Sequence, residues 1–166
     1  CFPGSAKVTV QHRTGQGVAQ DIEIRHLRVG DHVHVGAGAF SKVVGFSHHD
    51  PNAVTQFRGL QTAAGQWLWL TANHLLHVGA LGRLKAAGRV NPGDTLYQAN
   101  GQSTKVVGVT KQAMRGLYSP HTATGDICVD SIVASCYTTL TAVWLQRLGV
   151  ALIRLVNAVP GIAGLL

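Results

Sequence analysis

Residues at two places in this chain could together break a peptide bond. Cys1 puts a thiol at the first position, and Thr71 and His74 form a Thr-x-x-His motif directly after the apolar run Trp67–Leu70. A thiol with a pKa of about 8.5 becomes a strong nucleophile only when a base or a positive neighbour helps to deprotonate it. We therefore expect Cys1 to attack the peptide bond before it, and we expect the numbering to start at a cut in a longer precursor.

The Thr-x-x-His motif supplies the other groups that such a reaction needs. An acyl shift from nitrogen to sulfur expels an amine, which is a poor leaving group until it is protonated. A histidine with a pKa of about 6.5 can donate that proton at neutral pH, so His74 is the predicted general acid. Thr71 can hydrogen-bond the scissile amide and help to twist it, which weakens the resonance of the planar peptide. The alternatives are a turn closed by Thr71 and a structural core histidine at position 74.

The elements around these residues contain an internal repeat. Three segments of the first half recur in the same order in the second half, at nearly constant spacing. The pairs are Leu27–Val33 with Val90–Leu96, Ser41–Ser47 with Thr104–Thr110, and Thr62–Gly65 with Thr122–Gly125. Two copies are too few for a solenoid, which needs at least three. We expect instead two related β units that form one body with a pseudo-two-fold axis.

The repeat does not extend to the chemistry. The position of Thr71 is matched by Ser131 in the second copy, and the position of His74 is matched by Ala134. The sequence therefore predicts that the first copy carries the catalytic residues and that the second copy serves as a scaffold.

The length and composition indicate a single all-β domain. The chain has 166 residues, of which 20 are glycine, and short Val- and Thr-rich runs lie between turn signals. Polar and apolar residues alternate in Lys7–Val10 and in His32–Val35, which predicts strands. The Gly-Asp and Asn-Pro-Gly-Asp stretches predict turns, because glycine tolerates positive φ and proline presets φ.

Charge and cysteine content narrow the possible partners. The formal charge is +7, but the basic residues are scattered and no nucleic-acid-binding signature is present, so we expect no nucleic-acid partner. The three cysteines are an odd number, which argues against a structural disulfide framework, and Cys128 is assigned to the core. His48, His49 and Asp50 lack further ligands at metal-binding spacing. We expect a monomer without a metal or cofactor.

The end of the chain differs in character from the rest. Residues 142–166 form a predicted separate segment, in which Ala142–Val159 has helical periodicity with a narrow polar stripe and Pro160-Gly161 ends the helix. The alternative is a helix that packs on the core of residues 1–141. Because most of its surface is apolar, we expect this helix to bind a lipid or the membrane surface. The predicted lipid contacts are Trp144, Leu148, Leu152 and Leu155.

Taken together, these motifs resemble the autoprocessing domain of hedgehog-type proteins, which has the Hint fold that it shares with inteins. The resemblance covers roughly residues 1–141 and continues weakly into the final helix. The matching segments are Cys1-Phe2, Leu27-x-x-Gly30-Asp31-x-Val33, Thr71-x-x-His74-Leu75 and Val129–Tyr137. The resemblance implies a Hint fold with duplicated β units.

The resemblance also implies a two-step reaction on the upstream segment of the same chain. Cys1 first converts the peptide bond into a thioester. A sterol or other lipid alcohol, cholesterol in hedgehog proteins, then takes the upstream segment as an ester, in the secretory pathway at the endoplasmic reticulum. Splicing is not expected, because the chain ends Ala163–Leu166 rather than His-Asn. Three alternatives stay open: release by hydrolysis, an amidase acting on free substrates, and a membrane-binding module without activity.

Two positions of the hedgehog pattern leave alternatives open in this chain: the base of the second step and the role of Cys136. Hedgehog proteins activate the sterol hydroxyl with an Asp, and a gap-free count back from Thr71 places that position on His48. We therefore expect His48 to be the base, with Asp50 as the alternative base if the alignment shifts slightly. The remaining alternative is an exposed turn at residues 47–52 capped by Asp50. Cys136 corresponds to a Cys near the nucleophile in hedgehog relatives. It can form a reversible disulfide with Cys1, assist thioester exchange, or simply fill the core.

Overall fold

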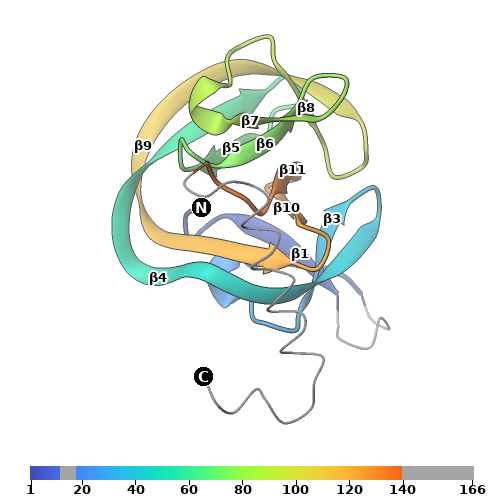
Figure 1. The fold of residues 1–166 in the computed structure, drawn as a ribbon, viewed down its shortest axis with the longest axis vertical. Helices are drawn as coiled ribbons and strands as arrows, with labels where there is room; N and C mark the ends of the chain where they lie inside the picture. The colour runs from blue at the N-terminus through green and yellow to red at the C-terminus, as the bar shows by residue number, and fades with distance from the viewer. Residues whose placement is uncertain (12–17, 140–166) are drawn as a thin grey trace.

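The computed structural model describes residues 1–11 and 18–139, and these form an all-β domain (Figure 1). The fold class predicted from the sequence is therefore confirmed. The strands are β1 (Lys7–Gln11), β2 (Gln20–Glu23), β3 (His32–Gly36), β4 (Ala39–Thr62), β5 (Trp67–Leu70), β6 (Leu75–Val78), β7 (Arg83–Ala86), β8 (Thr95–Tyr97), β9 (Ser103–Thr122), β10 (Asp126–Val129) and β11 (Ile132–Ser135). Two 3-10 turns, η1 (Ile24–His26) and η2 (Ala87–Arg89), precede β3 and β8.

The C-terminal predictions fall beyond this part of the chain. The helix expected at Ala142–Val159 and its lipid contacts Trp144, Leu148, Leu152 and Leu155 lie outside the described residues, as does the segment boundary at residue 142. Within residues 1–11 and 18–139, no helix is long and apolar enough to cross a membrane.

Two long strands organise the domain. β4 and β9 pair antiparallel from Val43 opposite Thr122 to Thr62 opposite Val106. Figure 1 shows them as a curved double band that wraps around the shorter strands. Register shifts interrupt the pairing at several points, including Phe46/His48, and such bulges bend a strand and redirect its side chains. Strong curvature therefore brings the middle of β4 close to the hairpins that it encloses.

The internal repeat is present in three dimensions. The sheet order is β2-β1-β3-β4-β9-β8, with β5 paired to β4, so a β3–β4 hairpin faces a β8–β9 hairpin. Equivalent backbone bonds close the two turns: Gly30 N–H donates to the Val43 carbonyl and Gly93 N–H donates to the Val106 carbonyl, each over 2.8 Å. The φ angles of the two glycines are 95° and 96°, a region that side chains disfavour. The expected pair of related β units is confirmed.

Alternating strands supply the core. In β1, Val8 and Val10 point inward while Lys7 is exposed, as the sequence pattern predicts. In β5, Leu68 and Leu70 are buried and the two tryptophans stand on the other face. β5 thus ends with a buried leucine directly before Thr71, and β6 begins with Leu75 and Leu76, which are also buried. The loop 71–74 is held at both ends by core side chains.

Candidate active site

The first residues of the chain are built into the interior. Phe2 pairs with Tyr118 of β9 through two backbone hydrogen bonds, of 2.8 and 3.0 Å, and its side chain is fully buried. The Thr71 N–H donates to the Cys1 carbonyl over 2.9 Å. Cys1 itself is buried, with a relative solvent exposure of 6%. The nitrogen and sulfur of Cys1 therefore lie at fixed positions beside the 71–74 loop.

Two side chains of that loop meet the nitrogen of Cys1. The amine donates to Thr71 Oγ1 over 3.0 Å and to His74 Nδ1 over 2.6 Å. A backbone bond from His74 N–H to the Thr71 carbonyl closes the turn and sets both side chains on the same side. Thr71 thus closes a turn and also contacts Cys1. The structure brings together the three residues that the sequence singled out first.

The second ring nitrogen of His74 fixes the orientation of the imidazole. Nε2 lies 2.7 Å from the Ser135 carbonyl, which can only accept, so Nε2 carries a proton. In the neutral ring, Nδ1 is then the acceptor that faces the Cys1 nitrogen. In the protonated ring, Nδ1–H points at the same nitrogen. The Phe2 ring, with its centroid 4.5 Å from that of His74, packs against the imidazole. His74 can therefore pass a proton to and from the Cys1 nitrogen without turning.

Burial controls the protonation of this pair. The pKa of the Cys1 amine is lowered from 8.0 to about 4, because the buried surroundings disfavour its charged form. The pKa of His74 lies well below its ordinary value, first because the ring is fully buried and second because of the neighbouring amine charge. The hydrogen bond to the Ser135 carbonyl partly opposes this shift. Near neutral pH, the amine and the imidazole are both uncharged.

His48 reaches the sulfur of Cys1 from another direction. It lies in the middle of β4, next to the Phe46/His48 bulge, and its Nδ1 is 3.5 Å from the Cys1 sulfur. His48 is exposed, so its imidazole is accessible from solvent while it touches the thiol. The sulfur and the nitrogen of Cys1 thus each face a different histidine.

Asp50 is differently placed. It is exposed, and its Oδ1 accepts hydrogen bonds from the backbone N–H groups of Asn52, over 2.8 Å, and Ala53, over 3.1 Å. These bonds belong to the irregular stretch where β4 and β9 shift register between Asp50 and Val54. The capping role that was one alternative for Asp50 is therefore seen, within a long strand rather than in a separate turn at 47–52.

The other two cysteines are free and buried, as is Cys1. Burial raises the pKa of Cys136 to about 11, and the Thr122 hydroxyl lies 3.6 Å from its sulfur. Burial also raises the pKa of Cys128 to about 12, which fits its assignment to the core. Both thiols are protonated at neutral pH. Cys136 can therefore fill the core beside the site, and a part in thioester exchange would require its deprotonation.

Two features of the site escaped the sequence patterns. One is the Ser135 carbonyl, a backbone group that no side-chain motif can reveal. The other is His121 in β9, which is 7% exposed and has a buried Nδ1 without a hydrogen-bond partner. Its pKa is lowered by burial, then by the Cys1 amine and by His48, so it lies within electrostatic reach of the site. It lies outside the repeated segments, and the β4–β9 pairing, in which it stands opposite Gly45, brings it near the site.

Among residues 1–11 and 18–139, no group of three or more His, Cys, Asp or Glu side chains could hold a metal ion.

Comparison with known proteins agrees with this geometry. A family model described as the Hint module matches residues 1–164. The Tiggy-winkle hedgehog protein of Danio rerio is 36% identical over 84% of this chain and 36% of its own length. Warthog protein 6 of Caenorhabditis elegans is 32% identical over 89% of this chain and 26% of its own length. The chain thus spans well under half of these curated relatives.

Solved structures show the same fold at low sequence identity. The gp41-1 intein superposes with a TM-score of 0.67 at 15% identity, covering 81% of this chain and 96% of the intein. An intein-like domain from Clostridium thermocellum superposes with a TM-score of 0.60 at 16% identity, covering 81% of this chain and 99% of that domain. With a Cys1 nitrogen held by a Thr-x-x-His loop inside a duplicated β fold, and a family model that matches nearly its whole length, the chain belongs to the Hint family of autoprocessing domains.

Proposed function

We propose that this domain cuts the peptide bond before Cys1 and transfers the upstream segment to a sterol or another lipid alcohol. The proposed cleavage step rests on the two contacts that the Cys1 nitrogen makes with Thr71 and His74. In a precursor this nitrogen belongs to the scissile amide, so the amine stands for the leaving group after cleavage. The substrate is then an upstream segment of the same chain, and the reaction is single-turnover.

The first step is an acyl shift from nitrogen to sulfur. The Cys1 sulfur, once deprotonated, adds to the carbonyl carbon of the preceding residue. Neutral His74 first takes up the thiol proton, and the C–N bond breaks as its Nδ1–H donates that proton to the nitrogen. Thr71 Oγ1, 3.0 Å from the same nitrogen, favours a pyramidal geometry over the planar amide. His74 is neutral again after this transfer, and the products are a thioester and a neutral amine.

The second step releases the upstream segment. A hydroxyl group attacks the thioester carbonyl carbon, and His48, 3.5 Å from the sulfur, takes the hydroxyl proton. The C–S bond breaks and His48 returns the proton to the Cys1 thiolate. A neutral imidazole is a competent base near neutral pH, whereas an unperturbed carboxylate is weakly basic. Asp50 is the less favoured base, because its carboxylate already accepts two backbone hydrogen bonds.

The need for a second nucleophile follows from the buried amine. A neutral amine next to a thioester attacks it readily and restores the peptide bond, so the first step alone is reversible. A lipid alcohol resolves the thioester irreversibly and would be met in the secretory pathway at the endoplasmic reticulum, where we place the reaction. The second candidate is hydrolysis, which the exposure of His48 favours because water can reach it.

The decisive experiment joins a soluble reporter to the residue before Cys1 and measures the mass of the released reporter. We expect release with dithiothreitol, and release as a sterol ester when a sterol is supplied in detergent. Cys1→Ala is the control and should stay intact under both conditions. A released reporter with a free carboxylate in the presence of sterol supports hydrolysis, whereas cleavage of the Cys1→Ala protein at the same bond would overturn the mechanism.

A further inference from the structure

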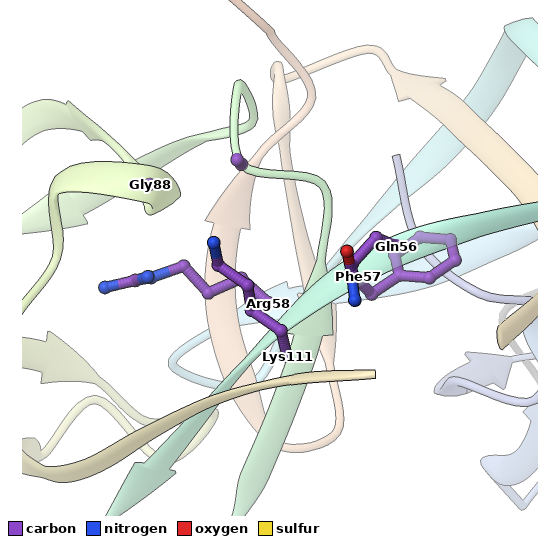
Figure 2. A pocket seen from close by; sticks show the side chains of 6 residues that line it. Gln56, Phe57, Arg58, Gly88 and Lys111 are labelled. Carbon is purple, nitrogen blue, oxygen red and sulfur yellow. The ribbon is translucent and has the colours of Figure 1, made fainter. Parts of the chain in front are cut away.

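A small cavity beside the catalytic loop has an unusual charge. It has a volume of about 260 Å³ and is lined by Gln56, Phe57, Arg58, Ala72, Gly88 and Lys111. Two of these residues are cations and none is an acid. Figure 2 shows the long side chains of Arg58 and Lys111 extending to the same side, toward the turn that carries Gly88. The cavity thus concentrates positive charge without a counter-charge of its own.

The sheet register makes this pairing of cations costly. Arg58 of β4 stands directly opposite Lys111 of β9. Like charges that face each other across an antiparallel pair destabilise a sheet. Within residues 1–11 and 18–139, no carboxylate forms an ion pair with either residue. An anion between the two side chains would remove this repulsion.

Arg58 also has an unused donor. Its Nη2 donates to the Val90 carbonyl over 2.7 Å, which anchors the guanidinium below the end of η2. Its Nε is buried and has no hydrogen-bond partner. A buried donor without an acceptor loses its hydrogen bonds to water and forms none in their place, which costs free energy. The exposed side chain of Lys111 can move, so an incoming oxyanion can approach this N–H from the Lys111 side.

The wall of the cavity touches the catalytic loop. Gly88 N–H donates to the Ala72 carbonyl over 2.7 Å, and a Cβ at position 88 would lie 3.0 Å from that oxygen. Ala72 follows Thr71, so this close contact ties the cavity to the loop that holds the Cys1 nitrogen. A group bound here would lie next to Ala72 of this loop.

We infer that this cavity is a binding site for a phosphate group, held by Arg58 and Lys111. A phosphate monoester carries about −1.5 to −2 charges at pH 7, which balances two cations better than a carboxylate does. Its several oxygens can accept from the Arg58 Nε–H and from the Lys111 ammonium together. The group can belong to a soluble phosphate or to the headgroup of a phosphomonoester lipid. The inference does not depend on the proposed function, because it concerns binding alone.

The test measures stability against inorganic phosphate. In the wild-type domain, the urea midpoint should rise with phosphate concentration beyond the change produced by sodium chloride at equal ionic strength. Lys111→Gln and Arg58→Gln should each weaken the phosphate effect roughly tenfold or more. Lys42→Gln, which removes an exposed lysine elsewhere on β4, is the matched control and should respond like the wild type.

The order of stability of Lys111→Gln and the wild type should reverse when phosphate is added, which a purely structural role of Lys111 cannot produce. Without phosphate and at low salt, Lys111→Gln should be more stable than the wild type, because it removes the facing charge. With phosphate, the order should reverse. Equal phosphate and chloride effects, or an unchanged phosphate effect in Lys111→Gln, would overturn the inference.

A second arm separates the two sources of the phosphate group. The domain is sedimented with phosphatidylcholine vesicles that contain or lack phosphatidic acid. Binding to the phosphatidic acid vesicles that Lys111→Gln loses and Lys42→Gln keeps assigns the site to a lipid headgroup. A phosphate effect on the urea midpoint without such binding assigns it to soluble phosphate. Without a phosphate effect on the urea midpoint the site is refuted, whether or not the domain binds the vesicles.

Discussion

The buried amine of Cys1 makes the stability of the cleaved domain depend on pH in a way that the precursor cannot share. Its pKa falls from 8.0 to about 4 on folding. Between these values the unfolded chain binds a proton that the folded chain does not. Stability therefore rises with pH across this window, and it is lost as pH falls from 8 toward 4. In a precursor the same nitrogen is an amide and does not titrate.

The size of the effect follows from the shift. One proton per molecule corresponds to about 1.4 kcal/mol per pH unit, so the free energy of unfolding should rise by about 2.5 kcal/mol between pH 5 and 7. The full window of four units sets an upper limit of about 5 kcal/mol. His74 and His121 also have lowered pKa values and add a pH dependence in the same direction below pH 6.5. Because both histidines are present in the precursor as well, their contribution largely cancels in a comparison.

The assay compares two proteins in which this nitrogen is an amine or an amide. Both carry Cys1→Ala, which prevents cleavage; one has a free amine at position 1 and the other has an upstream segment. Urea unfolding is followed by the fluorescence of Trp67 and Trp69, whose indole rings stack with centroids 5.6 Å apart. We expect the stability difference between the two proteins to change by about 2.5 kcal/mol from pH 5 to 7. Parallel pH profiles would refute the buried neutral amine and with it the argument for reversibility.

The remaining predictions concern the two steps of the reaction and the end of the chain. His74→Ala and Thr71→Ala should slow thiol-induced cleavage of a reporter fusion by roughly 10²–10⁴-fold, the loss typical of an acid–base group; normal cleavage by His74→Ala with dithiothreitol would remove it from the first step. His48→Ala should accumulate thioester that added thiol still releases, while Asp50→Ala forms ester at the normal rate; the opposite pattern by mass spectrometry would make Asp50 the base. A chain ending at Thr141 should keep thiol-induced cleavage and lose lipid ester, and unchanged ester formation would leave the last segment only a structural role.

Local sequence was sufficient to predict the fold class and some of its elements. Strand alternation predicted β1 and β3, because their valines lie in the core or pack against it. The repeated Gly-Asp turns predicted the duplication, because a positive φ at Gly30 and Gly93 is required wherever that turn is built. Cys1, Thr71 and His74 were recognisable because their chemical types are informative without their neighbours.

Long-range pairing accounts for what the sequence left open. The gap-free count from Thr71 favoured His48 but left Asp50 as an alternative, since the positions of both side chains depend on the register shifts in the pairing of β4 with β9. Those bulges place the His48 ring against the Cys1 sulfur and leave Asp50 to cap a backbone turn. The role of His48 in the second step stays a prediction. His121 was missed for the same reason, because it reaches the site only through the pairing of the two long strands.

Both of the duplicated halves contact the site, in different ways. The first copy supplies the side chains that meet Cys1, as the unmatched Thr-x-x-His predicts. The second copy supplies backbone: Tyr118 binds Phe2, and the Ser135 carbonyl holds His74 in the tautomer that faces the nitrogen. A backbone carbonyl can perform this task with almost any side chain, so the second copy could lose its own Thr-x-x-His without losing its part in the site. The asymmetry seen in the sequence is therefore a division between side-chain chemistry and backbone positioning.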